Sequence, residues 1–167
     1  MRLSRPIDFV SQMVFIIVCV VLGTVIVLNY LHTPAPADAE VLPSGAPVAG
    51  ITQIHPEEVD ITVLVAVSAD CRFCTVSMPF YARSAAAAAR SRRRVRMVIA
   101  ADAPVESTKL YIGQFSVRPT GIARLPNGVH LKGTPTLLVI SPAGELLAGW
   151  FGRLSPRQEE GLLRLLS

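Results

Sequence analysis

The stretch ADCRFC at residues 69–74 carries two cysteines with two residues between them. An apolar, β-branched run, ITVLVAV at residues 61–67, precedes it, and a segment of helical composition, residues 75–94, follows it. We therefore expect the cysteines between a strand and the first turn of a helix, where free backbone N–H groups and the helix dipole favour the thiolate of Cys71. Cys74 lies one turn further on and can close a disulfide with Cys71. The arrangement predicts a dithiol–disulfide redox centre.

A Cys-x-x-Cys pair can also be half of a zinc site. Structural zinc takes four ligands, usually with a second pair at similar spacing. The chain has only one further cysteine, Cys19, and its three histidines, His32, His55 and His130, are scattered. This ligand set does not favour zinc. Another interpretation is that both cysteines are buried structural residues, but this interpretation does not explain why the pair begins a helix.

Length and charge limit the function further. The 167 residues are enough for one ordinary domain and an appendage. The net charge is +4, and many of the basic side chains gather at residues 90–96. A nucleic-acid surface would interleave such residues with aromatics or set them in a recognised binding fold. We interpret the run as the solvated end of a helix, where cations suit the dipole, and predict no nucleic-acid partner.

An apolar segment, FVSQMVFIIVCVVLGTVIVLNYL, occupies residues 9–31 and carries no charge. About 20 such residues span the hydrocarbon core of a bilayer as a helix. Because Arg2 and Arg5 precede it, the positive-inside rule leaves residues 1–8 in the cytoplasm and sends the remainder across. The sequence ADA at residues 37–39 would suit cleavage, but the apolar region is longer than the roughly 7–15 residues of a signal core. We predict an uncleaved single-pass transmembrane anchor.

The anchor is followed by residues 32–50, which are rich in proline, alanine and glycine. Such a composition builds no core and is typical of a semi-extended tether. The predicted folded domain then covers residues 51–167. Cys19, inside the apolar segment, is interpreted as a small apolar filler of the anchor helix.

Within the domain, apolar periodicity and turn signals predict an α/β protein with the order β-α-β-α-β-β-α. Leu110, Ile112 and Phe115 are the expected buried side chains of the second helix. Ser155 is the expected N-cap of the last helix, and Gln158 completes a capping box. The expected ranges are strand 61–68, helix 74–94, strand 95–101, helix 105–115, loop 125–132, strands 136–140 and 145–151, and helix 156–166.

A second motif, GTPT at residues 133–136, opens the third of these strands. Proline is tolerated at the first position of a strand, and that alone can explain Pro135. The functional interpretation is a cis-proline, which fixes a tight turn and leaves the backbone N–H and C=O of Thr134 free. Beside a reactive cysteine, such an edge can pair with a substrate backbone as an added strand.

The two motifs in this order, with a hairpin turn SPAGE at residues 141–145, resemble the thioredoxin fold. The anchor, the tether, GTPTL at residues 133–137 and GWFG at residues 149–152 resemble the membrane-tethered TlpA/ResA-like thiol–disulfide oxidoreductases of the bacterial envelope. The resemblance extends over residues 51–166. It implies a central mixed sheet flanked by helices.

The resemblance also implies roles for site residues. Cys71 corresponds to the attacking cysteine and Cys74 to the resolving one, while Pro135 corresponds to the cis-proline, with Thr134 before it. Both residues of that loop are expected to contact substrate. No cofactor is implied beyond the redox-active disulfide itself.

The residues around the cysteines depart from the common family pattern. Asp70 stands where many thioredoxin-like proteins have tryptophan, and Arg72 and Phe73 separate the cysteines. We expect Arg72 to favour the Cys71 thiolate and Asp70 to oppose it. Arg72 and Phe73 are both expected to contact substrate, and Phe73 should offer an apolar contact beside the sulfur.

The buried acid of thioredoxin has no counterpart here, because the strand at residues 61–68 contains no carboxylate. Glu106 or a water is then the expected proton acceptor for Cys74.

The implied function is disulfide exchange with envelope proteins, with the domain on the periplasmic side of the bacterial cytoplasmic membrane. We expect a reductant, although oxidase and isomerase roles stay open, and a second envelope or membrane protein must supply or remove electrons. Clients could include cytochrome maturation proteins. Two alternatives remain: a copper chaperone of similar fold, using both cysteines and His130, and a tethered scaffold without redox turnover.

Overall fold

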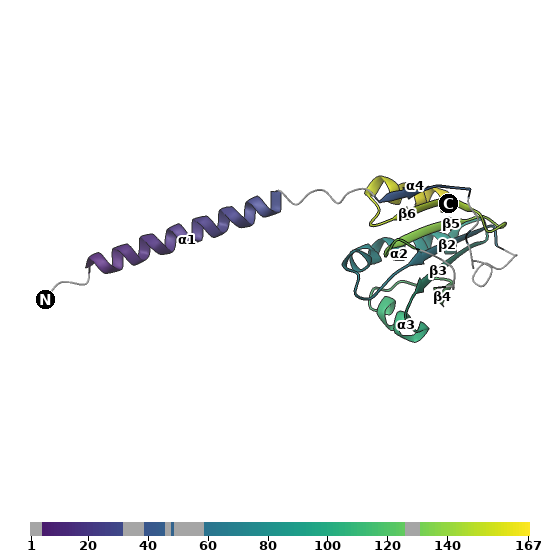
Figure 1. The fold of residues 1–167 in the computed structure, drawn as a ribbon, viewed down its shortest axis with the longest axis horizontal. Coiled ribbons are helices and arrows are strands. Elements are labelled where there is room, and N and C mark those ends of the chain that lie inside the picture. The colour runs from purple at the N-terminus through teal and green to yellow at the C-terminus, as the bar shows by residue number, and fades with distance from the viewer. Residues whose placement is uncertain (1–4, 32–38, 46–47, 49–58, 126–130) are drawn as a thin grey trace. The chain divides into compact units, whose positions relative to one another are not determined.

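The structure is a computed structural model that describes residues 5–31, 39–45, 48, 59–125 and 131–167 (Figure 1). Within the first of these segments, side chains are described for residues 12–27. The chain divides into two compact units, Met1–Ala35 and Pro36–Ser167.

The first unit contains one long helix, α1 (Arg5–Leu31), which begins before the apolar segment predicted at residues 9–31. Large apolar side chains along it, such as Phe15 and Ile26, are exposed. In the part of the chain that the structure describes, no helix combines the length and the apolar character needed to cross a membrane. The transmembrane role of residues 9–31 stays a prediction.

The second unit is a mixed sheet with helices packed on it (Figure 1). Its described strands lie in the order β1-β6-β5-β2-β3-β4. Strands β2, β3 and β4 run parallel, whereas β5 is antiparallel to β2, and β6 is antiparallel to both β5 and β1. The elements are β1 (Glu40–Leu42), β2 (Ile61–Ala66), α2 (Arg72–Arg90), β3 (Val95–Ala101), α3 (Val105–Gly113), β4 (Gly121–Arg124), β5 (Thr136–Ile140), β6 (Leu146–Phe151) and α4 (Pro156–Leu166).

The two faces of the sheet are covered differently. Val63 and Val65 of β2 pack with α2, α3 and α4 in the larger core cluster, whereas Leu64 points to the opposite face. On that face, Leu64 packs in a smaller cluster that Leu42 and Leu131 help to cover. Because β2 is buried on both sides, its sequence is apolar at every position except Thr62 and does not alternate with polar residues.

The helix α4 confirms the predicted start at Ser155. The backbone N–H of Ser155 donates to Gln158 Oε1 at 2.9 Å, which closes the capping box with Pro156 at the first helical position. Leu162 and Leu166 are fully buried against the sheet. The predicted strands at 95–101 and 136–140 are confirmed, as is the antiparallel hairpin of β5 with β6.

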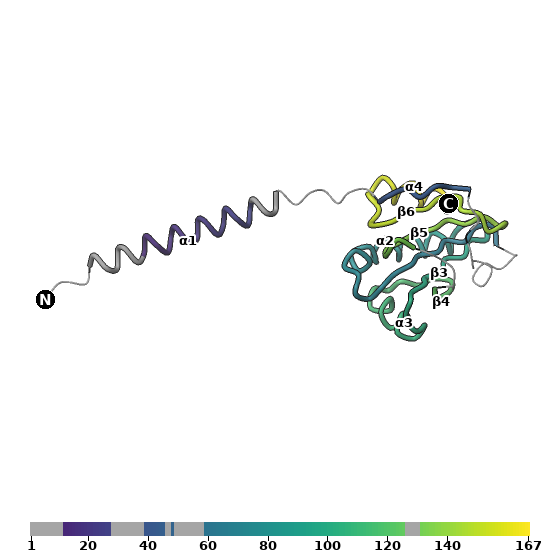
Figure 2. The backbone as a smooth tube through the Cα atoms, viewed as in Figure 1, coloured from purple at the N-terminus to yellow at the C-terminus, as the bar shows by residue number. Residues whose placement is uncertain are grey.

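The structure differs from the predicted tether at residues 40–42, because β1 lies within the predicted range 32–50 and pairs with β6 (Figure 2). Just before this strand, Gln158 of α4 accepts a hydrogen bond from the Ala39 N–H at 3.2 Å and donates one to the Ala39 C=O at 2.9 Å. The folded unit therefore begins before Ile51. A strand of three residues is too short to show an apolar pattern in the sequence, so only its pairing with β6 identifies it.

Two further expectations need correction in the region of α3. Leu110 is 74% exposed and not part of the core, whereas Ile112 is buried and Phe115 packs against the core from a half-buried position. Strand β4 was not predicted; it precedes the expected loop at 125–132 and pairs with β3. The first helix of the domain also ends at Arg90, earlier than the predicted residue 94.

Candidate redox site

The cysteine pair lies at the start of α2, as predicted from the strand–helix junction. Cys71 is the N-cap, with an extended backbone (φ −89°, ψ 106°), and the Cys74 N–H donates to Cys71 Sγ at 3.1 Å. The two residues form a disulfide, with their Cα atoms 5.2 Å apart. An N–H group of the first helical turn thus points directly at the sulfur that would carry negative charge after reduction.

The two sulfurs differ in accessibility. Cys71 is half-buried, whereas Cys74 is fully buried in the core between α2 and the sheet. A thiol from another protein can therefore approach the disulfide at Cys71 and not at Cys74. The roles that the resemblance implies, Cys71 as the attacking and Cys74 as the resolving cysteine, fit this difference and stay a prediction.

The second motif comes to the same place. The Thr134–Pro135 peptide bond is cis, and the Thr134 carbonyl oxygen lies 3.2 Å from Cys71 Sγ. Pro135 is buried, and its carbonyl accepts a hydrogen bond from the Gly152 N–H at 2.8 Å. The Thr136 hydroxyl donates to the Gly133 carbonyl at 2.7 Å. Backbone and side-chain hydrogen bonds thus hold the loop against the sulfur.

The register of the sheet explains why these distant segments meet. Ala66, at the end of β2, pairs with Thr136, at the start of β5. In an antiparallel pair the end of one strand lies beside the start of the other. The residues after β2, which lead to Cys71, and the residues before β5, which include Thr134, must therefore share one edge of the sheet.

Arg72 and Phe73, the two residues between the cysteines, are exposed. Phe73 shows 58% of its surface to solvent directly beside the disulfide, and no described residue forms an ion pair with Arg72. Asp70 is also exposed, and its backbone N–H donates to Ser68 Oγ at 3.4 Å. The structure thus brings Thr134 to Cys71 and leaves Arg72 and Phe73 free for a second molecule.

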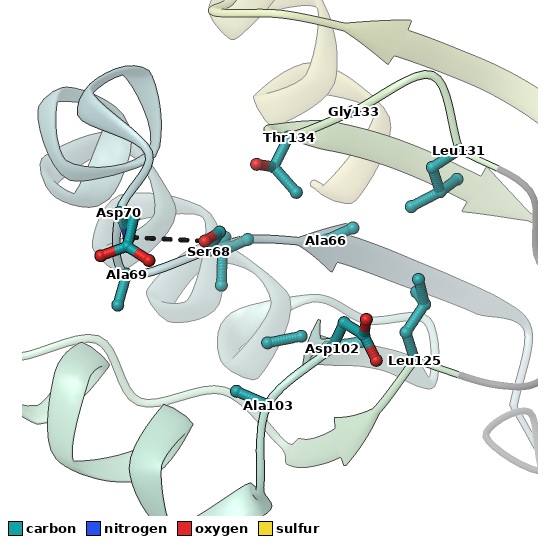
Figure 3. Close-up of a pocket in the computed structure, with 13 residues that line it drawn as sticks. Ala66, Ser68, Ala69, Asp70, Asp102, Ala103, Leu125, Leu131, Gly133 and Thr134 are labelled. Carbon is teal, nitrogen blue, oxygen red and sulfur yellow. Dashed lines mark hydrogen bonds between the residues drawn. The ribbon is translucent and has the colours of Figure 1, made fainter.

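A groove of about 650 Å³ opens next to the site (Figure 3). In Figure 3, Ser68 and Asp70 lie at one end, Leu125 and Leu131 at the other, and Thr134 faces the segment that carries Asp102. The lining is mainly small and apolar, with carboxylates at two places. Its remaining described members are Ala66, Val67, Ala69, Ala100, Ala101, Ala103 and Gly133.

A hydroxyl pair that sequence reasoning missed ties α3 to the start of α2. Thr75, next to Cys74, and Tyr111 of α3 share a hydrogen bond of 2.9 Å between their hydroxyl oxygens. The Tyr111 ring also makes an edge-to-face contact with Phe115, at 5.6 Å between centroids. Tyr111 lies between the two apolar residues expected to be buried, Leu110 and Ile112, so helical spacing alone gave no reason to select it.

The expected proton acceptor for Cys74 is not beside it. Glu106 is exposed in the first turn of α3, whereas Cys74 is fully buried. In the described part of the chain, no hydrogen bond joins a carboxylate to Cys74, and no group of three or more His, Cys, Asp or Glu side chains is placed to hold a metal ion. His130, the histidine considered for copper, lies outside the described residues.

By sequence, the chain matches no protein-family model and no curated protein. By structure, it is similar to a thiol:disulfide interchange protein of the thioredoxin family from Chlorobium tepidum, with 18% identity, a TM-score of 0.53 and coverage of 80% of this chain and 98% of that one. A secreted Mycobacterium tuberculosis disulfide oxidoreductase homologous to E. coli DsbE gives 16% identity, a TM-score of 0.53 and coverage of 74% and 95%.

A third similar structure is the thioredoxin domain of a thiol-disulfide oxidoreductase from Bacteroides vulgatus, with 13% identity, a TM-score of 0.53 and coverage of 81% and 100%. At these identities the likeness establishes the fold. The predicted thioredoxin-like α/β fold, with a mixed sheet and flanking helices, is confirmed.

Proposed function

We propose that the chain is a thiol–disulfide oxidoreductase that exchanges disulfides with other proteins through Cys71 and Cys74. The observation that carries the proposal is the asymmetric disulfide at the start of α2. Its reachable sulfur, Cys71, receives the Cys74 N–H and lies against the Thr134 carbonyl, while its other sulfur is buried. The similar solved structures, described as disulfide oxidoreductases and interchange proteins, support the same chemistry.

The reaction runs in two exchanges. In the reduced protein, the Cys71 thiolate attacks a client disulfide; a Cys71–client bond forms, and the second client sulfur leaves with the electron pair. The Cys74 thiolate then attacks Cys71 Sγ and releases the first client sulfur, which regenerates the Cys71–Cys74 disulfide. The protein gives two electrons to the client, and the N–H of Cys74 stabilises the Cys71 thiolate beforehand.

The groove beside the disulfide receives the client segment that flanks its cysteine. Thr134 offers backbone groups at the edge nearest Cys71, and the small side chains of the lining leave room for an extended polypeptide. Exposed Phe73, between the two cysteines, provides an apolar contact beside the sulfur. No cofactor is needed, because the electrons reside in the cysteine pair.

Single-cysteine variants test the activity. Cys71→Ser should abolish reduction of a model disulfide protein such as insulin, because the remaining cysteine of the pair, Cys74, is buried and cannot reach a client disulfide. Cys74→Ala should retain the first exchange, fail to complete the second and accumulate mixed disulfides that appear on non-reducing gels. The exposed Cys19 in α1 serves as the control, since Cys19→Ser should behave as the wild type. Full activity of Cys71→Ser would refute the assignment.

We further propose that the protein acts as a reductant on the periplasmic side of the cytoplasmic membrane, with α1 as its anchor and an envelope protein as its electron donor. The support is the uncharged segment at residues 9–31, with Arg2 and Arg5 before it, and the resemblance to tethered oxidoreductases.

Cell fractionation tests the location. The full chain should stay in the membrane pellet after alkaline carbonate extraction, and externally added protease should digest the domain in spheroplasts. Recovery of a shortened chain in the soluble periplasmic fraction would instead identify residues 9–31 as a cleaved signal.

A further inference from the structure

One buried hydroxyl near the disulfide has no hydrogen-bond partner. Ser77 of α2 is 4% exposed, and its Oγ makes no hydrogen bond in the described part of the chain. Ser84, two turns along the same buried face, is equally enclosed but donates to the Phe80 carbonyl at 3.0 Å. A serine in a helix normally satisfies itself by this bond to the preceding turn. Ser77 therefore keeps an unsatisfied polar group where burial makes it costly.

The position of Ser77 connects it with Cys74. The two residues are three apart on the buried face of α2, a spacing at which helical side chains are neighbours. Side chains in a helix lean toward its N-terminus, so the Ser77 side chain lies over the turn that contains Cys74. Ser77 is thus one helical turn from the Cys74 sulfur, which is bonded to Cys71 in the disulfide.

In the described part of the chain, no hydrogen bond is made to the Cys74 sulfur in the disulfide. Val63, Val65 and Val67, from β2 and the residue after it, share the core cluster with Cys74 and bring no polar side chain. The next hydroxyl on the same face belongs to Tyr81. Burial raises the pKa of Tyr81 far above its usual range, and a weak hydrogen-bonding interaction with the Ser77 hydroxyl lowers it, although the two hydroxyls miss the geometry of a full hydrogen bond.

We propose that the Ser77 hydroxyl is the hydrogen-bond donor to the Cys74 sulfur once the disulfide opens. The inference rests on the proposed disulfide exchange. When a thiolate of the electron-donor protein attacks Cys71 Sγ, a bond forms between that protein and Cys71, and the Cys71–Cys74 bond breaks. The electron pair remains on the Cys74 sulfur, which becomes a buried thiolate. A hydroxyl held one turn away, with no full hydrogen bond in the oxidised form, stabilises that charge.

The consequence is a higher reduction potential than the same site would have without this donor. In the oxidised state the unsatisfied hydroxyl destabilises the protein, and in the reduced state its hydrogen bond to the Cys74 thiolate stabilises it. Both effects favour reduction. Ser77 donates a hydrogen bond to the sulfur but does not accept a proton from it, because a serine hydroxyl is too weak a base. The neutral hydroxyl therefore stabilises the thiolate, whereas a negatively charged carboxylate would repel it.

The test is the redox midpoint of the full chain in mild detergent, wild type against Ser77→Ala and Ser84→Ala. Each is equilibrated in dithiothreitol or glutathione buffers, acid-quenched and labelled with a maleimide that adds mass. Cys19 adds one label in every state, so a difference of two labels reports Cys71 and Cys74. Thermal unfolding of each variant confirms that it is folded.

We expect Ser77→Ala to shift the equilibrium about tenfold toward the disulfide, or about 30 mV more negative for a two-electron couple. Ser84→Ala removes the same atom from the same face and should leave the midpoint unchanged. An unshifted Ser77→Ala, or an equal shift in both variants, would overturn the role of Ser77. If the wild type shows no two-electron transition, the proposed function itself fails.

Discussion

Cys71 and Cys74 illustrate how far the surroundings of a side chain determine its chemistry. Cys71 ends an extended segment and is the N-cap of α2, so backbone groups with no helical partner face its sulfur. Cys74 is one turn inside the helix and sits in the core. In the proposed mechanism, a client therefore reaches only the first sulfur, and the second reacts with the first. The different roles proposed for the two cysteines follow from their positions, since the two residues are chemically identical.

A charged pair at the opposite end of β2 gives a prediction about acid stability. The side-chain hydrogen bond from Arg94, at 2.9 Å, holds the pKa of Asp60 below its usual range. A depressed folded-state pKa stabilises the fold above the unfolded-state pKa, about 3.9, and that contribution is lost as the pH falls through the folded-state value. Because the pair is exposed, the contribution is small.

We expect Asp60→Asn to lower the thermal unfolding midpoint slightly at neutral pH and to flatten its decline below about pH 4. Glu160→Gln, which loses a looser exposed pair with Arg164, is the control and should keep the wild-type decline. Parallel acid profiles of wild type and Asp60→Asn would show that the pair does not stabilise the fold.

Helix α3 shows what an apolar pattern leaves undecided. Leu110 and Ile112 are both apolar and two residues apart, so they cannot share one helix face, and the sequence does not say which faces the core. The structure buries Ile112 and leaves Leu110 exposed. Packing against β3 and β4 makes the choice, and β4 itself was not predicted because it is short and contains Gly121.

This difference yields a paired prediction for α3. Ile112→Ala should lower the free energy of unfolding by roughly 3 kcal/mol, through lost burial and the cavity left behind. Leu110→Ala, at a side chain that is 74% exposed, should change it by less than about 0.5 kcal/mol. Urea unfolding measures both. Equal losses would mean that α3 does not sit on the sheet with Ile112 inward.

Strand β1 makes a second prediction at the level of secondary structure. A fragment of residues 51–167 lacks β1 and the two hydrogen bonds between Gln158 and Ala39, whereas a fragment of residues 36–167 keeps them. The shorter fragment should unfold with a free energy lower by roughly 2–4 kcal/mol, from lost hydrogen bonds and exposed apolar surface.

A point substitution separates this contact from the effect of truncation. In the longer fragment, Gln158→Ala should cost about 1–2 kcal/mol, because it removes both bonds to Ala39 and the bond to the Ser155 N–H. Arg157→Ala, at the exposed neighbouring position, should cost little. If both fragments unfolded at the same urea concentration, β1 would be no part of the stable fold.

Taken over the molecule, the features predictable from sequence are those that local chemistry determines. The central strands are apolar, the cysteines follow one strand, and Pro135 precedes another. Together these features predicted the fold and the proximity of Cys71 and Thr134. The short edge strands β1 and β4, Tyr111 beside Thr75 and the unpaired hydroxyl of Ser77 depend on tertiary packing. Nothing in their local sequence distinguishes them from loop, surface or core-filling residues.

We propose that the Cys71–Cys74 disulfide is an exchangeable redox centre whose reduced form gives electrons to clients. Equilibration of the full chain across dithiothreitol and glutathione buffers, followed by thiol labelling, tests it most directly. We predict a single two-electron transition with a midpoint near that of thioredoxin, about −270 mV. A midpoint near −120 mV would make the protein an oxidant, and a disulfide that shows no transition across these buffers would contradict the claim altogether.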